Sequence, residues 1–216
     1  MAEVQNHGVL FEDTVIRSIT GMSKEEYQSQ LEGAYVASMD ILKGHHSDVN
    51  YSVKVSGGKS LGCGDIIRFL KHCRDDNFSI IAGSWRQVTP EKKVYKEIYE
   101  FDITPEHFEK LFKNMSEEVL QEFVDYVKAI PPGKEAQLEN RRLWKEKRKA
   151  IYETCGRGVM AIDAKIDSKT QRRVQCSAKI QGLIDAEIPY RKYTEEYRGI
   201  QLPYEQESKP RTFSTT

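Results

Sequence analysis

An apolar run at residues 78–85 constrains the fold more than any other segment of the chain. Its side chains are mostly apolar, with small residues between them, and such a run predicts a strand in the centre of a sheet. Residues 93–103 alternate apolar and charged side chains, which is the pattern of a second strand. We therefore expect the two segments to pair as a hairpin.

Helices are predicted on either side of this hairpin in the sequence. Apolar residues recur at helical spacing over residues 11–18, and Ser23 with Glu26 forms a capping box that starts a helix running towards Ala37. Further helices are expected over residues 66–73, after Pro105, and over residues 116–130 and 135–152. Strands are expected at residues 49–56, 159–166 and 173–183, and residues 38–43 fit either a helix end or a short strand. The predicted fold class is α/β, with a central mixed sheet.

The chain has 216 residues, which suits one large domain or a core with an appended subdomain. The break at Pro131-Pro132-Gly133 suggests the division. We expect a core at residues 1–130 and a basic helix with a hairpin at residues 131–204, packed on the same core. The polar tail at residues 205–216 is expected to be disordered.

Composition excludes several classes of protein. The chain has 33 basic and 33 acidic residues, which argues against coating nucleic acid by bulk charge. The sequence has no apolar run long enough for a membrane helix and no signal peptide at its start, so we expect a cytoplasmic protein with no membrane partner. Its 4 cysteines have no CxxC spacing, so neither a zinc site nor a disulfide framework is indicated.

Lys54 is the strongest indication of chemistry. It lies in the alternating segment at residues 50–56, two residues after Ser52, so both side chains share one face of the strand. Asp40 precedes it, and Glu12 lies on the first predicted helix. Carboxylates can hold Mg²⁺, which activates water against a phosphodiester, and a lysine can stabilise the attacking hydroxide or the charge on phosphorus.

This order of residues resembles the PD-(D/E)xK nuclease core found in type II restriction endonucleases. The resemblance covers roughly residues 7–103 and is carried by Glu12 with the four residues before it, by Asp40 or the Ser47-Asp48 pair, and by Ser52-Val53-Lys54. It implies a restriction-endonuclease-like sheet flanked by helices. It also implies Mg²⁺ held by Asp40, Glu12 and Asp48, with Lys54 and Ser52 completing the catalytic set.

The sequence departs from the family at one position, and one ligand has two candidates. Ser52 stands where the family has Glu or Asp. This departure is consistent either with an acid supplied from another position, for which Asp65 is the candidate, or with an inactive site. Asp40 has the spacing expected for a neighbouring strand, whereas Asp48 is close to Lys54 and would require the strand to bend. Both aspartates remain candidates.

Two basic segments suit contacts with DNA phosphates and bases. Residues 141–149 hold six basic residues and one acid, interleaved with Trp144. Residues 168–183 hold four basic residues and no acid, and resemble a β-ribbon in which arginine pairs with guanine and glutamine with adenine. The residues expected to contact DNA are Lys59, Ser60, Arg141, Arg142, Lys145, Arg148, Lys169, Arg172, Arg173, Gln175 and Lys179.

The expected function is that of a sequence-specific, Mg²⁺-dependent endonuclease of restriction type. It would cut double-stranded DNA as a homodimer, because a palindromic site is matched by a symmetric protein. The alternative from another class is a non-catalytic DNA-binding or interaction protein on the same fold. Cleavage of plasmid in the presence of Mg²⁺ separates the two.

Overall fold

The chain folds into two compact units, seen in a computed structural model that describes residues 3–31, 39–44, 46–57, 60–89, 91–167 and 170–207, with only the backbone described for residues 3–8 and 139. The first unit is built from the described parts of Met1–Leu61, Phe78–Ile103 and Pro189–Thr216. The second is built from those of Gly62–Asn77 and Thr104–Ile188.

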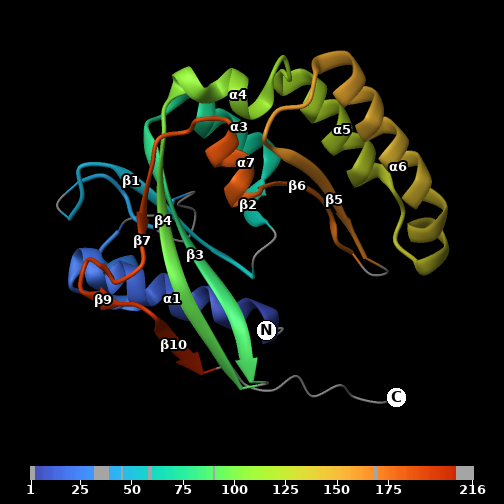
Figure 1. The fold of residues 1–216 in the computed structure, drawn as a ribbon. Helices are drawn as coiled ribbons and strands as arrows, with labels where there is room; N and C mark the ends of the chain where they lie inside the picture. Colours follow the sequence, from blue (N-terminus) through green and yellow to red (C-terminus); the bar gives the residue numbers. More distant parts are fainter. Residues whose placement is uncertain are drawn as a thin grey trace. The chain divides into compact units, whose positions relative to one another are not determined.

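A five-stranded mixed sheet forms the centre of the first unit (Figure 1). Its strands are β1 (Asn50–Ser56), β3 (Phe78–Thr89), β4 (Lys92–Ile103), β7 (Tyr190–Tyr193) and β10 (Tyr204–Glu207). β1 runs parallel to β3, and the pairs β3–β4, β4–β7 and β4–β10 are antiparallel. The predicted mixed α/β class and the predicted hairpin between β3 and β4 are therefore confirmed.

Helix α1 (Glu3–Thr20) packs on this sheet. The Phe11 ring stacks on Tyr95 with ring centroids 4.5 Å apart. Gly83 leaves the space for this contact, because a Cβ added there would come within 2.5 Å of the Phe11 ring. The close approach fixes the register of α1 against β3, and so fixes where the next residue, Glu12, is presented.

Short elements complete the first unit. Helix α2 (Lys24–Ser29) starts with the predicted capping box, and residues 32–38, where the helix was expected to continue, lie outside the described residues. Strands β8 (Glu196–Tyr197) and β9 (Ile200–Gln201) form a small hairpin. Residues 205–207, which were expected to be disordered, belong to β10.

The second unit combines helices with a three-stranded sheet ordered β2-β6-β5. Its strands are β2 (Leu61–Asp65), which begins at the last residue of the first unit, β5 (Ala161–Ile166) and β6 (Arg172–Ala178). Its helices are α3 (Ile66–Asp75), the 3₁₀ turn η2 (Pro105–His107), α4 (Phe108–Phe112), α5 (Glu117–Ala129), α6 (Lys134–Cys155) and α7 (Ile180–Asp185). The break at Pro131-Pro132-Gly133 separates α5 from α6, so the division predicted there falls inside this unit.

One predicted strand is corrected. Residues 173–183 were expected to form a single strand, but β6 ends at Ala178 and helix α7 follows. Ile180, Leu183 and Ile184 stand at positions i, i+3 and i+4, which is the spacing of a helical apolar face. Leu183 is 1% exposed, so burial of that face favours the helix.

None of the helices in the described part of the chain is both long enough and apolar enough to cross a membrane.

Candidate functional site

Asp40 is anchored beside the edge of β1 in the first unit. Its backbone N–H donates to the Tyr51 carbonyl at 2.8 Å, and Ile41 forms an isolated bridge with the same residue. The Val53 N–H donates to Asp40 Oδ2 at 2.6 Å. The carboxylate therefore takes a backbone donor of the strand that carries Lys54, and its position is tightly determined.

The Lys54 ammonium lies between two oxygens. Its Nζ is 3.1 Å from Asp40 Oδ2 and 3.0 Å from the Val53 carbonyl oxygen. The Lys54 and Asp40 side chains are each 22% exposed, so the pair is partly shielded but open to a ligand. The structure brings together the two residues on which the sequence prediction depended most.

Glu12 reaches the same place from α1. Burial raises the pKa of Glu12 above its ordinary value of 4.5, the negative charge of Asp40 raises it further, and Lys24 opposes the shift. Lys24 Nζ lies 2.8 Å from Glu12 Oε1. The two carboxylates are thus close enough to repel each other, and each has a lysine as its counter-ion.

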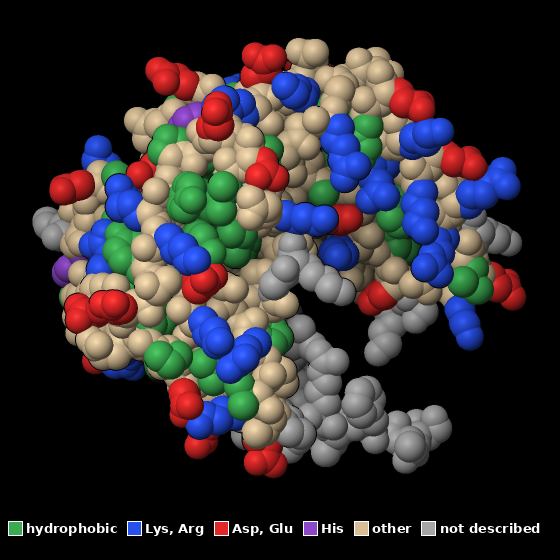
Figure 2. Space-filling model, in the orientation of Figure 1, with side chains coloured by type: hydrophobic (Ala, Val, Ile, Leu, Met, Phe, Trp, Pro, Cys, Tyr) green, Lys and Arg blue, Asp and Glu red, His purple; other side chains and the backbone are tan. Residues whose placement is uncertain are grey.

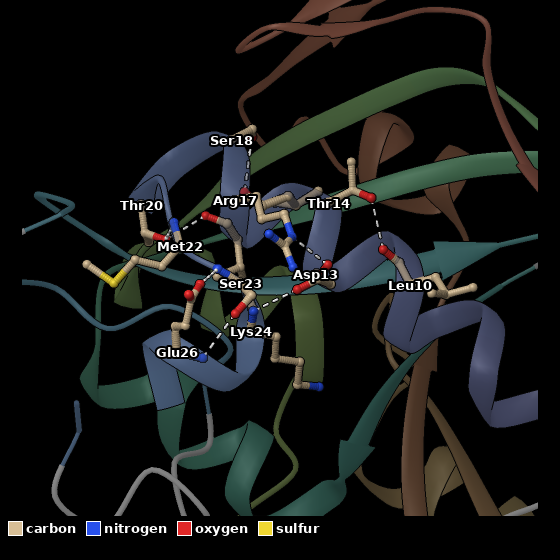
Figure 3. Close-up of polar contacts among 12 residues, drawn as sticks. Leu10, Asp13, Thr14, Arg17, Ser18, Thr20, Met22, Ser23, Lys24 and Glu26 are labelled. Carbon is tan, nitrogen blue, oxygen red and sulfur yellow. Dashed lines mark hydrogen bonds and ion pairs between the residues drawn. The ribbon is translucent and has the colours of Figure 1, made fainter. Parts of the chain in front are cut away.

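The corner between α1 and α2 holds Lys24 in position (Figure 3). The Lys24 backbone N–H donates to Asp13 Oδ1 at 2.7 Å, and Arg17 Nε donates to Asp13 Oδ2 at 2.8 Å. Ser23 and Glu26 close the capping box around the start of α2. Lys24 was not predicted as a site residue, although the capping box placed it at the first turn of a helix.

Ser52 adds a hydroxyl rather than an acid. Its residue is 3% exposed, and its Oγ donates to Asp40 Oδ2 over a long 3.4 Å. Within the described residues, no three or more His, Cys, Asp and Glu side chains group in a way that could hold a metal. The oxygens at this place are therefore two carboxylates, one hydroxyl and the Val53 carbonyl.

This oxygen set fits Mg²⁺. Magnesium is usually bound through one or two carboxylates, with waters and substrate phosphates filling its remaining positions. Glu12 and Asp40 would supply those carboxylates, and a divalent cation would offset the Asp40 charge, which adds to the effect of burial in raising the pKa of Glu12. We refer to Glu12, Lys24, Asp40, Ser52 and Lys54 as the carboxylate–lysine cluster.

The other candidate acids lie elsewhere. Asp48 lines a cavity to which none of Glu12, Asp40 and Lys54 contributes. Asp65 caps α3 in the second unit, where its Oδ1 accepts from the Arg68 N–H at 3.0 Å. A local structural role thus accounts for Asp65, and Asp48 belongs to different surroundings from the carboxylate–lysine cluster.

Basic side chains gather over α6 in the second unit (Figure 2). Arg141, Arg142 and Lys145 are exposed. Arg148 is half-buried: its guanidinium donates to the Ile162 carbonyl at 2.9 Å, and it lies over the Trp144 ring at 5.1 Å from the centroid. Arg142 pairs with Glu146 at 2.9 Å on the surface of the helix, and Arg148 connects the helix to β5.

The hairpin formed by β5 and β6 offers fewer free side chains than expected. The Arg172 side chain is 8% exposed and donates to the carbonyls of Ile130, Pro131, Asp167 and Gln171. Arg173 is exposed and Gln175 is half-buried on β6, and Lys179 is the exposed residue before α7. Arg172 therefore links the hairpin to the end of α5.

Three further residues were expected to contact DNA. Ser60 is exposed, and Lys59 and Lys169 lie outside the described residues.

A polar cavity of about 480 Å³ in the first unit was not predicted. Its wall includes Tyr51, Ser79 and Asp102, which are neighbours across β1, β3 and β4. Arg191 and Arg198 complete it from the C-terminal part of the unit. No sequence motif links these positions, so only the folded chain identifies the cavity.

Buried Glu100 organises the two arginines. The residue is 2% exposed; its Oε1 accepts from Arg191 Nη2 at 2.9 Å and lies 3.7 Å from Arg198 Nη2. The Tyr197 hydroxyl donates to Oε2 at 3.0 Å. Burial raises the pKa of Tyr197 and the Glu100 charge raises it further, so this phenol remains protonated and keeps donating.

Comparisons with protein-family models, curated proteins and solved structures give no match to this chain.

Proposed function

We propose that this chain is a Mg²⁺-dependent endonuclease that hydrolyses phosphodiester bonds in DNA. The observation that carries the proposal is the convergence of Glu12, Asp40 and Lys54, from separate elements, on one partly shielded place. The resemblance to the PD-(D/E)xK nucleases, on the restriction-endonuclease-like fold that we propose for the first unit, uses the same three residues.

The cluster can divide the chemistry among its members. Glu12 and Asp40 would hold Mg²⁺, which when bound polarises the phosphate and lowers the pKa of a coordinated water. Lys54 provides a fixed ammonium, which would orient the attacking water and stabilise negative charge on the phosphorane. The water oxygen would form a bond to phosphorus as its proton passes to solvent, and the P–O bond to the leaving group would break as the leaving oxygen takes a proton from solvent.

The form of activity that we propose is restriction-type cutting of double-stranded DNA. Arg141, Arg142 and Lys145 provide exposed cations for phosphate contacts. A homodimer in which each subunit cuts one strand agrees with a palindromic site, and a cytoplasmic location agrees with such a substrate.

A non-catalytic DNA-binding protein on the same fold is the second candidate. Ser52 favours it, because the cluster has a neutral hydroxyl where the nucleases carry a third acid. The Lys54 ammonium also donates a hydrogen bond to Asp40 Oδ2, one of the oxygens proposed to hold the metal. A protein of this kind would shift DNA in a gel without cutting it.

Incubation of the protein with plasmid and Mg²⁺ tests the proposal. Discrete fragments support restriction-type cutting, a smear supports a non-specific nuclease, and a gel shift without cutting supports the second candidate. Chelation of Mg²⁺ should stop cleavage.

Lys54→Ala should lower the cleavage rate by at least about 10²-fold, as expected when one electrostatic donor is removed from a site, while DNA affinity changes little. The matched control is Lys96→Ala, which removes an exposed lysine of β4 and should cut like the parent. Undiminished cleavage in Lys54→Ala would refute the role assigned to the lysine.

A further inference from the structure

Lys24 is fixed at its backbone, whereas its ammonium depends on one contact. The Lys24 backbone N–H donates to Asp13 Oδ1 at 2.7 Å, so the start of α2 is held without the help of the lysine side chain. That side chain extends away from Asp13 and from Glu26 of the capping box (Figure 3). Within the described residues, the Lys24 ammonium pairs with Glu12, at 2.8 Å from Oε1. The position of the ammonium therefore depends on Glu12.

Lys54, the other lysine of the carboxylate–lysine cluster, has two acceptors. Its Nζ donates to Asp40 Oδ2 and also to the Val53 carbonyl oxygen. The Val53 N–H donates to the same carboxylate oxygen, so Lys54 and its partner are both held by the backbone of β1. Displacement of Lys54 would break two hydrogen bonds. Displacement of Lys24 would break one contact, so Lys24 is the lysine that can leave more easily.

The two lysines balance the charges of the cluster. Glu12 and Asp40 bring two negative charges, and Lys24 and Lys54 bring two positive charges. A divalent cation added to this set would leave two surplus positive charges. The four side chains are between 16% and 22% exposed, and repulsion between like charges is stronger where water is partly excluded. A cation and the Lys24 ammonium are therefore expected to compete for Glu12.

We propose that Lys24 is a resident counter-ion that competes with Mg²⁺ for Glu12 and releases this carboxylate when the cation binds. This role rests on the proposed function, because it takes Glu12 and Asp40 as the metal ligands. The lysine side chain is long and 22% exposed, and an ammonium on such a chain reaches water readily. Lys24 thus neutralises Glu12 in the metal-free protein and lowers the affinity of the site for the metal.

Lys24→Met tests this role, because methionine keeps a long unbranched side chain and removes the charge. Titration calorimetry with the full chain, MgCl₂ and no DNA measures the affinity without any need for cleavage. Lys24→Met should bind Mg²⁺ about tenfold more tightly than the parent, the factor expected when one competing charge-assisted hydrogen bond is lost. Lys24→Arg should bind Mg²⁺ like the parent, because arginine also pairs with a carboxylate.

The matched control is Lys71→Met. Lys71 Nζ pairs with Glu117 Oε1 at 2.7 Å in the second unit, so this variant removes an ion pair of the same kind outside the carboxylate–lysine cluster. Its Mg²⁺ affinity should equal that of the parent. A gain in affinity in both methionine variants would show a general effect of net charge and would overturn the role of Lys24.

The opposite change in Lys24→Met is equally informative. Weaker Mg²⁺ binding would mean that Lys24 holds Glu12 in place for the metal rather than competing with it. Unchanged affinity, or no Mg²⁺ binding by either the parent or Lys24→Met, would also overturn the role. If Lys24→Arg bound as tightly as Lys24→Met, the charge of the lysine would not be the cause.

Cleavage of plasmid keeps this role apart from the nuclease activity. If the protein cuts, the Mg²⁺ concentration that gives half-maximal cleavage should be lower for Lys24→Met than for the parent. Cleavage by a parent whose Mg²⁺ affinity is not raised by Lys24→Met would refute only the counter-ion. Tighter Mg²⁺ binding by Lys24→Met in a protein that never cuts DNA would refute only the nuclease.

Discussion

The carboxylate of Glu12 is buried beside a second carboxylate, and this position disfavours its ionised form in the folded state. The raised pKa of Glu12 means that the folded chain holds this proton more tightly than the unfolded chain does. Stability therefore falls as the pH rises from about 4.5 through the raised pKa. The residue that we propose as a metal ligand thus lowers the stability of the folded chain at neutral pH.

Glu12→Gln should raise the melting temperature at pH 8 and change it little at pH 4. Relief of about 1 kcal/mol would correspond to roughly 2–4 °C for a chain of this size. The same variant should lose Mg²⁺ binding, measured by calorimetry. Glu91→Gln, at an exposed turn residue, is the control. A lower melting temperature for Glu12→Gln at pH 8 would show instead that the ion pair with Lys24 outweighs the burial.

The sequence allowed Glu12 and Lys54 to be singled out because local patterns position both of them, whereas Asp40 was favoured over Asp48 only by its spacing from Lys54 in the family resemblance. A helical apolar stripe carries Glu12, and an alternating strand carries Lys54. Arg191 and Arg198 carry no such pattern. They approach Glu100 only because β7 pairs with β4 and the β8–β9 hairpin follows it, about 90 residues later in the chain than Glu100, and long-range pairing of this kind leaves no local signal.

The element that matters most for the candidate site is α1, because its packing against β3 decides where Glu12 lies. This packing depends on a close contact between Gly83 and the Phe11 ring. Even the smallest side chain at position 83 must displace the ring, which is a flat group stacked against Tyr95.

Gly83→Ala should destabilise the protein by about 1–3 kcal/mol, the usual cost of overpacking a core, as measured by urea unfolding. It should also weaken Mg²⁺ binding, since α1 must shift. Phe11→Leu in the Gly83→Ala background should restore part of both losses by freeing space. If Gly83→Ala keeps full stability and metal affinity, α1 does not pack on β3 through the contact between Gly83 and the Phe11 ring.

Helices and strands were predicted well where a single hydrophobic periodicity runs through the segment. They were predicted less well where a strand periodicity passes directly into a helical one. β3, β4 and α5 were recognised from unbroken patterns. Residues 173–183 were not, because β6 passes into α7 through the single residue Lys179. The alternating pattern before Lys179 hid the helical spacing that follows it.

At the scale of the whole molecule, binding to DNA should depend on salt through α6. The triple replacement of Arg141, Arg142 and Lys145 by alanine should reduce the slope of log affinity against log salt concentration by about one unit per residue removed. Fluorescence anisotropy at several salt concentrations measures the slope. Arg148→Ala should instead lower stability, because its guanidinium binds the backbone of β5. An unchanged slope in the triple variant would refute the proposal that α6 contacts DNA.

The order of segments along the chain has a consequence for dissection of the protein. The polypeptide passes from one unit to the other after residues 61, 77, 103 and 188. A truncation at any single peptide bond would therefore leave at least one unit incomplete. Neither unit is a continuous segment of the chain. A single proteolytic cut therefore cannot release either unit with all of its segments.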